Sequence, residues 1–364
     1  MISRKCRPIK KSDDSGIGTK TIPAFESNGQ WRPRREKTGP YLRGGGIAVL
    51  NRRGVVIFPE EFNREWENRI YTAGLNVLGL HPDPKGRPVA EVMDAFLTEE
   101  NRAALARLEE RGVTVEWEMH ALSWLLPRDL FGKHPDWFRM NRDGERTPDY
   151  NLCASNEEAL EEISCRAAEL ARLFRPRSNR YYFWLDDVTD SACYCPDCQK
   201  LTHADQALKT YNAIIRGIRR TNPAATQCYL AYHDTNELPQ QVKPEPGLFL
   251  EYAPMDRDFD KGIADESSEK NRRENRHLSE LLSFFGTEGA QVLDYWLDNS
   301  LFSGWKKPPK PFRLYRETVE ADVRYYRGLG IDSITTFACY LGEEYTALYS
   351  EPKEIEEYGR LLRG

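Results

Sequence analysis

Two adjacent carboxyl groups, Asp186 and Asp187, follow an aromatic run at residues 181–185. Repulsion between neighbouring carboxylates keeps a proton on one of them, and the protonated member can act as a general acid. The other member stays ionised and can orient a substrate or stabilise positive charge. The alternative is an Asp-Asp turn that begins a loop, so the pair alone allows both interpretations.

A second group of residues that could bind a metal ion is the C-x-C-x-x-C run formed by Cys193, Cys195 and Cys198, with His203 shortly after it. Three thiolates and one imidazole are a tetrahedral ligand set for zinc, and four protein ligands would close its coordination shell. We therefore expect a structural zinc, with no cofactor required for catalysis; the alternative is a loop of reduced thiols. The remaining cysteines look isolated and suited to core packing: Cys6, Cys153, Cys165, Cys228 and Cys339.

Composition narrows the classes of protein to be considered. The net charge of -5 is small and negative, so the composition lacks the positive charge that is typical of nucleic-acid-binding proteins. No apolar run approaches the ~20 residues of a membrane span. The basic N-terminus has no apolar stretch after it, so we expect no secretory signal and a cytoplasmic location, although a truncated N-terminus would look the same. The 8 Trp and 18 Tyr suit binding to sugar faces as well as core packing.

The order of elements predicts a (β/α)8 barrel at residues 46–364, preceded by a flexible basic tail at residues 1–45. Helical stretches separate the apolar runs, and Ser155 with Glu158 predicts a capping box at the start of one helix. Eight parallel strands can close into a barrel. An open doubly wound sheet is the alternative, but the sequence lacks the glycine-rich phosphate motifs of ordinary nucleotide binders. The predicted strands are 54–58, 76–80, 113–119, 180–185, 227–232, 248–252, 290–296 and 333–340.

Polar residues follow these strands at the end where a barrel carries its active site. Loops are polar in any protein, which is the simpler explanation, but carboxylates and imidazoles recur at the strand ends. Aromatic residues near the same ends could form walls for a sugar ring. The predicted substrate-binding residues are His81, His120, Trp184, His233, Asp294, Tyr295, Trp296, Tyr340 and Glu343.

Three separated blocks resemble a family of bacterial proteins that carry the domain of unknown function 4838 (DUF4838). The first block runs from His134-Pro135-Asp136-Trp137-Phe138 through Asp143-Gly144-Glu145-Arg146 to Leu152-Cys153-Ala154-Ser155-Asn156. The second runs from Asp186-Asp187 to Cys193-Tyr194-Cys195-Pro196-Asp197-Cys198, and the third is Val292-Leu293-Asp294-Tyr295-Trp296. Their order and approximate spacing agree with the family over about residues 50 to 345.

The resemblance implies a barrel similar to family 20 hexosaminidases and α-glucuronidases, acting on an amino sugar or a uronic acid. In the hexosaminidases a Glu after the fourth strand protonates the leaving oxygen, and the preceding Asp holds the substrate's acetamido group. By position, Asp187 takes the acid role, Asp186 the orienting role, and Tyr295 supports the acetamido group or the sugar face. Asp187 departs from the pattern because its side chain is one methylene shorter than Glu.

The leading hypothesis is therefore a glycosidase with Asp187 as general acid and Asp186 as its partner. A retaining or inverting route would need a second carboxylate, for which Asp294 and Glu343 are the candidates. A barrel that binds carbohydrate without cleaving it is the second hypothesis. The third is a metal-dependent hydrolase that uses His81, His120 and His233.

Overall fold

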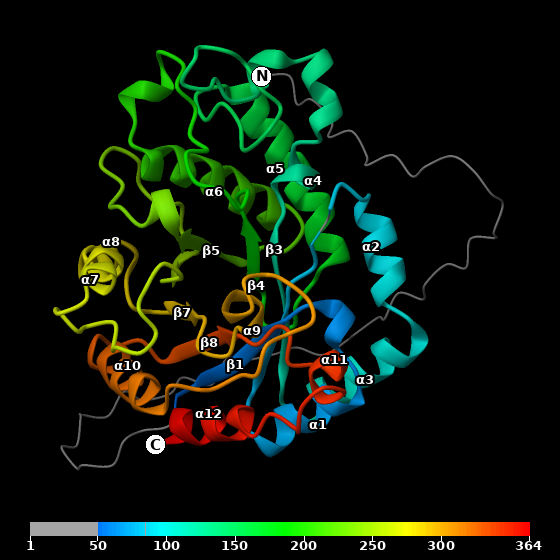
Figure 1. Cartoon of the computed structure of the whole chain (residues 1–364). Coiled ribbons are helices and arrows are strands. Elements are labelled where there is room, and N and C mark those ends of the chain that lie inside the picture. Colours follow the sequence, from blue (N-terminus) through cyan, green and yellow to red (C-terminus); the bar gives the residue numbers. More distant parts are fainter. Residues whose placement is uncertain (1–49, 84) are drawn as a thin grey trace, which may run out of the picture.

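The computed structural model describes residues 50–83 and 85–364, so the predicted tail at residues 1–45 lies outside the described residues. Eight parallel strands form a closed barrel in the order β1 to β8, and β8 pairs with β1. Figure 1 shows this barrel with its surrounding helices, which confirms the predicted fold class. The strands are β1 (Arg52–Ile57), β2 (Val77–Leu80), β3 (Thr114–His120), β4 (Arg180–Trp184), β5 (Thr226–Ala231), β6 (Leu248–Tyr252), β7 (Gln291–Asp294) and β8 (Ser333–Phe337).

Helices cover the outside of the barrel, and the last of them, α12, packs against α1 and α10. A search of the described helices for a segment able to span a bilayer found none. The helices are α1 (Arg64–Thr72), α2 (Val89–Phe96), α3 (Glu99–Glu110), α4 (Leu122–Leu125), α5 (Glu157–Leu173), α6 (His203–Arg219), α7 (Glu269–Asn275), α8 (Leu278–Phe285), α9 (Asn299–Phe302), α10 (Arg316–Gly328), α11 (Glu343–Thr346) and α12 (Glu354–Arg363).

Some local predictions were wrong in detail. The N-cap of α5 is Asn156 and not Ser155, because the Asn156 side chain accepts the hydrogen bond from the Ala159 N–H. A complete capping box occurs instead at α6, where Thr202 and Asp205 satisfy each other's backbone N–H groups. The segment between β6 and β7 holds two helices, α7 and α8, and the segment between β2 and β3 holds α2 and α3.

The barrel interior is filled by polar as well as apolar side chains. The Trp184 indole N–H donates to Glu251 at 2.8 Å, and Gln291 donates to the same carboxyl group at 3.0 Å. A Cβ atom on Gly79 would lie 2.5 Å from Glu118, so the glycine leaves room for that side chain. Burial raises the pKa of Glu118 well above its usual range, because a charged carboxylate is costly away from water. The interior is therefore a packed core that supports the residues above it.

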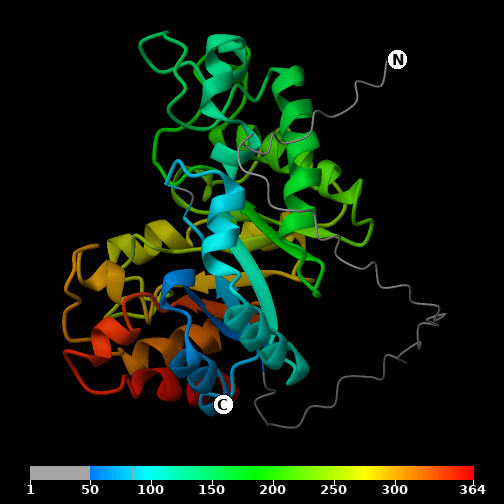
Figure 2. The same ribbon diagram turned by 90° about the vertical axis from the view of Figure 1, so that its right-hand side faces the viewer.

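Two long segments, between β3 and α5 and between β4 and α6, extend from the ends of their strands. In Figures 1 and 2 these teal and green segments lie together at one end of the molecule. Beneath them α5 and α6 pack closely, and a Cβ on Gly217 would lie 2.0 Å from the Ser164 carbonyl oxygen. Close approach of these helices thus depends on a glycine at residue 217.

We expect Gly217→Ala to lower the free energy of unfolding by about 1–3 kcal/mol, because the new methyl group forces α5 and α6 apart. Gly328→Ala is the matched control, since Gly328 is exposed on α10 and a methyl group added there would have nothing within 4 Å. That control should gain up to about 1 kcal/mol from reduced backbone freedom. Urea unfolding of both variants measures the difference, and equal stabilities would contradict the close helix contact.

Candidate functional site

A cavity of about 380 Å³ opens where β2, β3 and β4 end, and we call it the mouth cavity. Its size falls within the range of small-molecule sites. It brings together four of the predicted site residues: His81, His120, Asp186 and Asp187. The complete lining is His81, Pro82, Asp83, His120, Ser123, Arg128, Asp149, Tyr150, Asp186, Asp187 and Val188.

Asp187 presents an exposed carboxyl group at this cavity. The Tyr232 hydroxyl, at the end of β5, donates a hydrogen bond to Asp187 Oδ1 at 3.0 Å. A tyrosine hydroxyl can donate to a carboxylate or accept from a protonated carboxyl group. The contact therefore orients the Asp187 carboxyl group in either protonation state.

Asp186 has a different environment from its neighbour. Its Oδ2 accepts a hydrogen bond from the Asn151 backbone N–H at 2.6 Å and forms an ion pair with Arg128. The Asn151 side chain in turn accepts from the Asp186 backbone N–H at 3.0 Å. These contacts join the segment after β3 to the segment after β4, so Asp186 fixes the position at which Asp187 emerges.

Buried aromatic rings pack against His81, which lines the mouth cavity, and we call this group the aromatic floor. The ring of His81 lies 5.4 Å from Trp184, 5.4 Å from Phe337 and 5.6 Å from His120. Tyr295 stacks on Phe337 with ring centroids 5.3 Å apart. Trp184 is almost fully buried and hydrogen-bonded to Glu251 below, so it supports this floor from the barrel interior.

The two floor imidazoles are oriented by backbone carbonyl groups. His81 Nδ1 lies 2.7 Å from the Glu118 carbonyl oxygen, and His120 Nδ1 lies 2.5 Å from that of Leu185. A protonated Nδ1 in each ring would leave Nε2 as an acceptor. Burial, followed by the neighbouring His120, lowers the pKa of His81 to about 4. His81 is therefore a neutral hydrogen-bonding group at neutral pH.

Three other predicted residues lie at or near the strand ends, outside the lining of the mouth cavity. His233 packs on Tyr232 with ring centroids 3.8 Å apart, and burial lowers its pKa. Tyr340 follows β8, and its ring lies 6.3 Å from that of Phe58. Glu343 begins α11 and is exposed.

The predictions for Asp294 and Trp296 were wrong, because both side chains face the helix layer. Asp294 accepts hydrogen bonds from Arg257 at 3.0 Å and Tyr326 at 3.1 Å, and the Arg257 and Asp294 side chains are fully buried. The Trp296 indole N–H donates to the Asp322 carboxylate at 3.1 Å, and Asp322 also forms an ion pair with Arg257. This buried ion-pair network anchors α10 to β7 and removes Asp294 as a second catalytic carboxylate.

Two acidic residues near the mouth were missed by the sequence analysis. Asp83 lines the mouth cavity, its side chain is 46% exposed, and it directly follows the strand-end pair His81-Pro82. Glu61 lies just after β1, where its Oε1 accepts from the Tyr340 N–H at 2.8 Å. Burial raises the pKa of Glu61 to about 7. The sequence signal that could have identified them is their position shortly after β1 and β2.

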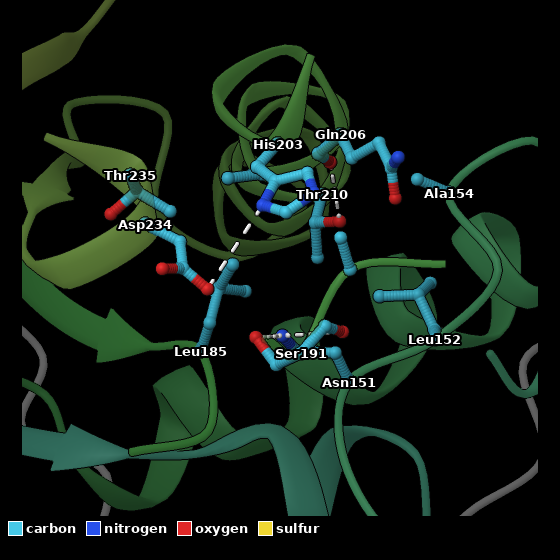
Figure 3. A pocket seen from close by; sticks show the side chains of 12 residues that line it. Asn151, Leu152, Ala154, Leu185, Ser191, His203, Gln206, Thr210, Asp234 and Thr235 are labelled. Carbon is cyan, nitrogen blue, oxygen red and sulfur yellow. Dashed lines mark hydrogen bonds and ion pairs between the residues drawn. The ribbon is translucent and has the colours of Figure 1, made fainter. Parts of the chain in front are cut away.

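The structure brings the three predicted cysteines together, but it adds Cys153 to them and not His203. The Sγ atoms of Cys153, Cys193, Cys195 and Cys198 lie within 4.8 Å of one another, and we call this group the cysteine cluster. His203 is not part of it, because its ring points toward Asp234, with Nδ1 4.0 Å from the carboxylate. Figure 3 shows these two side chains at a small cavity of about 30 Å³, which has room for about one water molecule.

The three-histidine hypothesis receives no support from this arrangement. Within residues 50–83 and 85–364, the cysteine cluster is the only group of at least three potential metal ligands that lie close enough to share an ion. His81 and His120 are neighbours, but His233 does not complete a set with them. The histidines therefore fit roles as hydrogen-bonding groups.

Because the folded state binds a proton to His81 only near pH 4, whereas the unfolded chain does so near 6.5, stability should depend on pH. This contribution is fully present above pH 6.5 and is lost as the pH falls toward 4, by up to about 3 kcal/mol. Urea unfolding of the wild type and His81→Asn measures it as the pH dependence of their difference. A constant difference, or a His81 NMR resonance that titrates near 6.5, would contradict the buried neutral ring.

Comparison with solved structures finds similar barrels among glycoside hydrolases. Gan42B, a GH42 β-galactosidase from G. stearothermophilus, is 12% identical with a TM-score of 0.51, covering 86% of this chain and 56% of that one. A β-galactosidase from Rahnella sp. R3 is 14% identical with a TM-score of 0.49, covering 87% and 56%. A GH5-4 endoglucanase from an uncultured bacterium is 13% identical with a TM-score of 0.48, covering 84% and 85%.

These similarities concern the fold, since identity is low and the chain spans only about 56% of the length of the β-galactosidases. A search of curated proteins found no match. The profile of the domain of unknown function DUF4838 matches residues 91–288, which is more than half of the chain. The matched region contains β3 to β6, both aspartates and the whole cysteine cluster. The chain therefore belongs to the DUF4838 family.

Proposed function

We propose that this chain is a glycoside hydrolase that cleaves a glycosidic bond at the mouth cavity, with Asp187 as general acid. The observation that carries the proposal is the exposed Asp187 carboxyl group, oriented by Tyr232 in the same cavity as the rings of His81, His120 and Tyr150. Aromatic faces suit the apolar C–H patches of a sugar, and imidazole nitrogens suit its hydroxyl groups. The similarity of the fold to the GH42 β-galactosidase Gan42B is consistent with this chemistry.

In the proposed reaction, protonated Asp187 donates its proton to the leaving glycosidic oxygen. Asp186, paired with Arg128, keeps the segment that carries Asp187 in place. His81 and His120 bind hydroxyl groups through Nε2, and the buried rings of Phe337 and Tyr295 support His81 from behind. Assignment of the sugar as an amino sugar or a uronic acid comes from the family resemblance alone.

A second carboxylate would be needed for an ordinary retaining or inverting mechanism. Asp83 is the best candidate on position, because it lines the same cavity and is partly exposed. Asp149 lines the cavity too, but its carboxylate is engaged by Arg139, which holds the Asp149 pKa well below its usual range. Glu343 is exposed on α11, outside this lining. We assign Asp83 the role of base or nucleophile.

One observation favours the alternative, a barrel that binds carbohydrate without cleaving it. The carboxylate that ends β7 is Asp294, and it is fully engaged in a buried ion pair. Asp187 is also a shorter acid than the Glu of the hexosaminidases. Binding would use the same ring floor, so only an assay for product can separate the two functions.

The proposed acid role predicts that Asp187→Asn lowers turnover by about 10²–10⁴-fold. The defect should be larger for disaccharides than for nitrophenyl glycosides, since an activated leaving group needs little help from a proton. A suitable panel contains galactosides, glucosides, N-acetylhexosaminides and glucuronides, assayed both as nitrophenyl derivatives and as disaccharides. Asp260→Asn, which alters an exposed carboxyl group outside the mouth cavity, is the matched control and should retain wild-type rates.

Equal defects on activated and natural substrates would contradict proton donation by Asp187, and near-normal turnover would exclude it from the mechanism. If the wild type releases no product from any glycoside but is retained on a glycan array, the binding function is correct instead.

A further inference from the structure

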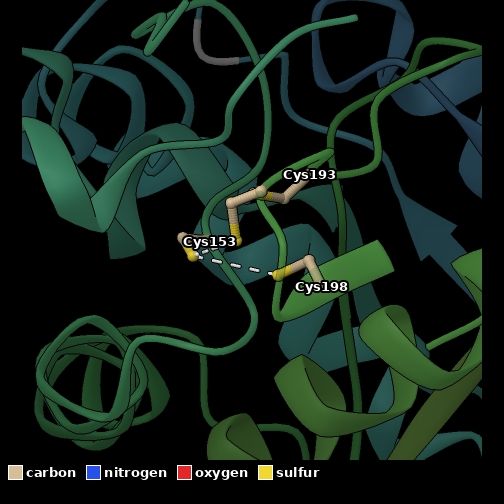
Figure 4. A group of neighbouring side chains, drawn as sticks. Cys153, Cys193 and Cys198 are labelled. Atoms are coloured by element: carbon tan, nitrogen blue, oxygen red, sulfur yellow. Dashed lines mark hydrogen bonds between the residues drawn. The ribbon is translucent and has the colours of Figure 1, made fainter. Parts of the chain in front are cut away.

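The cysteine cluster is a set of four buried thiols drawn from two segments of the chain. Cys153 precedes α5. Cys193, Cys195 and Cys198 lie in one run of six residues between β4 and α6. Figure 4 shows Cys153 facing Cys198 across the space between the two segments. Each of the four residues is at most 4% exposed. Four thiols converging in a buried place require an explanation beyond core packing.

Two of the distances between the sulfur atoms match those of tetrahedral coordination, and all four sulfurs lie within 4.8 Å of one another. The Sγ atom of Cys153 lies 3.6 Å from that of Cys195 and 3.8 Å from that of Cys198. Four sulfur ligands about 2.3 Å from a zinc ion lie about 3.8 Å apart at the corners of a tetrahedron. A disulfide would instead require a separation of about 2.05 Å. The sulfurs are therefore arranged around a common centre rather than joined in pairs.

Polar groups around the sulfurs would stabilise negative charge on them. The Met140 backbone N–H donates to Cys193 Sγ at 3.3 Å, and the Arg146 guanidinium lies 3.8 Å from the same sulfur. The Ser155 hydroxyl lies 3.2 Å from Cys198 Sγ and can donate to a thiolate. A tetrathiolate zinc centre carries two excess negative charges, so a nearby cation and N–H donors fit its second coordination sphere.

We propose that the cysteine cluster binds one Zn²⁺ ion through Cys153, Cys193, Cys195 and Cys198. Four soft thiolates in a tetrahedral array suit zinc, which has no competing geometric preference. Four protein ligands leave no open coordination position, and the buried sulfurs exclude a substrate. The ion is therefore structural, and the fourth ligand is Cys153 in place of His203.

The zinc joins the same two segments that Asp186 joins. Asn151, two residues before Cys153, donates from its side chain to Ser191 Oγ at 2.6 Å and from its backbone to Asp186. Ser191 in turn lies two residues before Cys193. Loss of the ion should therefore loosen the contacts that position Asp186 and Asp187. This effect on catalysis rests on the proposed function, whereas metal binding itself does not.

The test is the metal content of the purified full chain by inductively coupled plasma mass spectrometry, with X-ray absorption at the zinc edge. We expect about one zinc per chain, bound to four sulfurs at about 2.3 Å. Cys195→Ser should lose most of the zinc and melt at a lower temperature. Cys339→Ser, which alters another buried cysteine, and His203→Ala should both keep it.

Absence of stoichiometric metal from wild-type protein prepared with excess Zn²⁺ would overturn the proposal, even if Cys195→Ser fails to fold. Iron in place of zinc would overturn the choice of ion, and a shell of three sulfurs and one nitrogen would overturn the ligand set. Full zinc occupancy without glycosidase activity would refute the proposed function and leave the metal site intact.

Discussion

The carboxylate of Asp186 is the interaction on which the geometry of the mouth depends. It accepts hydrogen bonds from Arg128 and the Asn151 backbone, both in the segment that follows β3. Because Asp187 is the next residue, any movement of this segment would displace the proposed acid. A charge-assisted contact of this kind is stronger and more directional than a neutral one. The two adjacent aspartates thus have different roles: Asp186 fixes the loop, and Asp187 faces the cavity.

Burial distinguishes the carboxylates that hold the fold from those able to react. Asp294 and Asp322 surround Arg257 in a fully enclosed network, and Glu118 and Glu251 lie inside the barrel. Such groups cannot meet a substrate. The carboxyl groups of Asp83 and Asp187 line the cavity, where Asp83 forms a solvent-exposed ion pair with Lys85 and Asp187 accepts a hydrogen bond from Tyr232, so both stay accessible to a substrate. We therefore propose Asp83 and Asp187 as the reactive carboxyl groups, because they are accessible at the cavity and the others are buried.

Much of the fold was predictable, because apolar runs separated by helical patterns mark the eight strands directly. The direction in which each side chain points was harder to predict. A shift of one position on a strand moves a residue from the barrel mouth to the helix layer, and Asp294 and Trp296 were misplaced for that reason. Asp83 was missed because it lies three residues beyond the end of β2, and a position after a strand is a signal that many loop carboxyl groups share.

The cysteine cluster also could not be predicted completely from the sequence. The C-x-C-x-x-C run was visible as a local motif, but its fourth member lies far away in sequence and resembles an isolated core cysteine. His203 was chosen because it is near in sequence, yet it begins α6 and its ring is directed toward Asp234 (Figure 3). Only the folded arrangement of the two segments brings Cys153 to the other three sulfurs.

The most direct test of the central claim is a crystal structure of the protein soaked with iminosugars, whose cationic ring imitates the charge that develops during glycoside cleavage. The account predicts an inhibitor in the mouth cavity, with its nitrogen facing Asp83 and with Asp187 within hydrogen-bonding distance of the inhibitor. An inhibitor that binds elsewhere, or lies in the cavity without contact to Asp187, would contradict it.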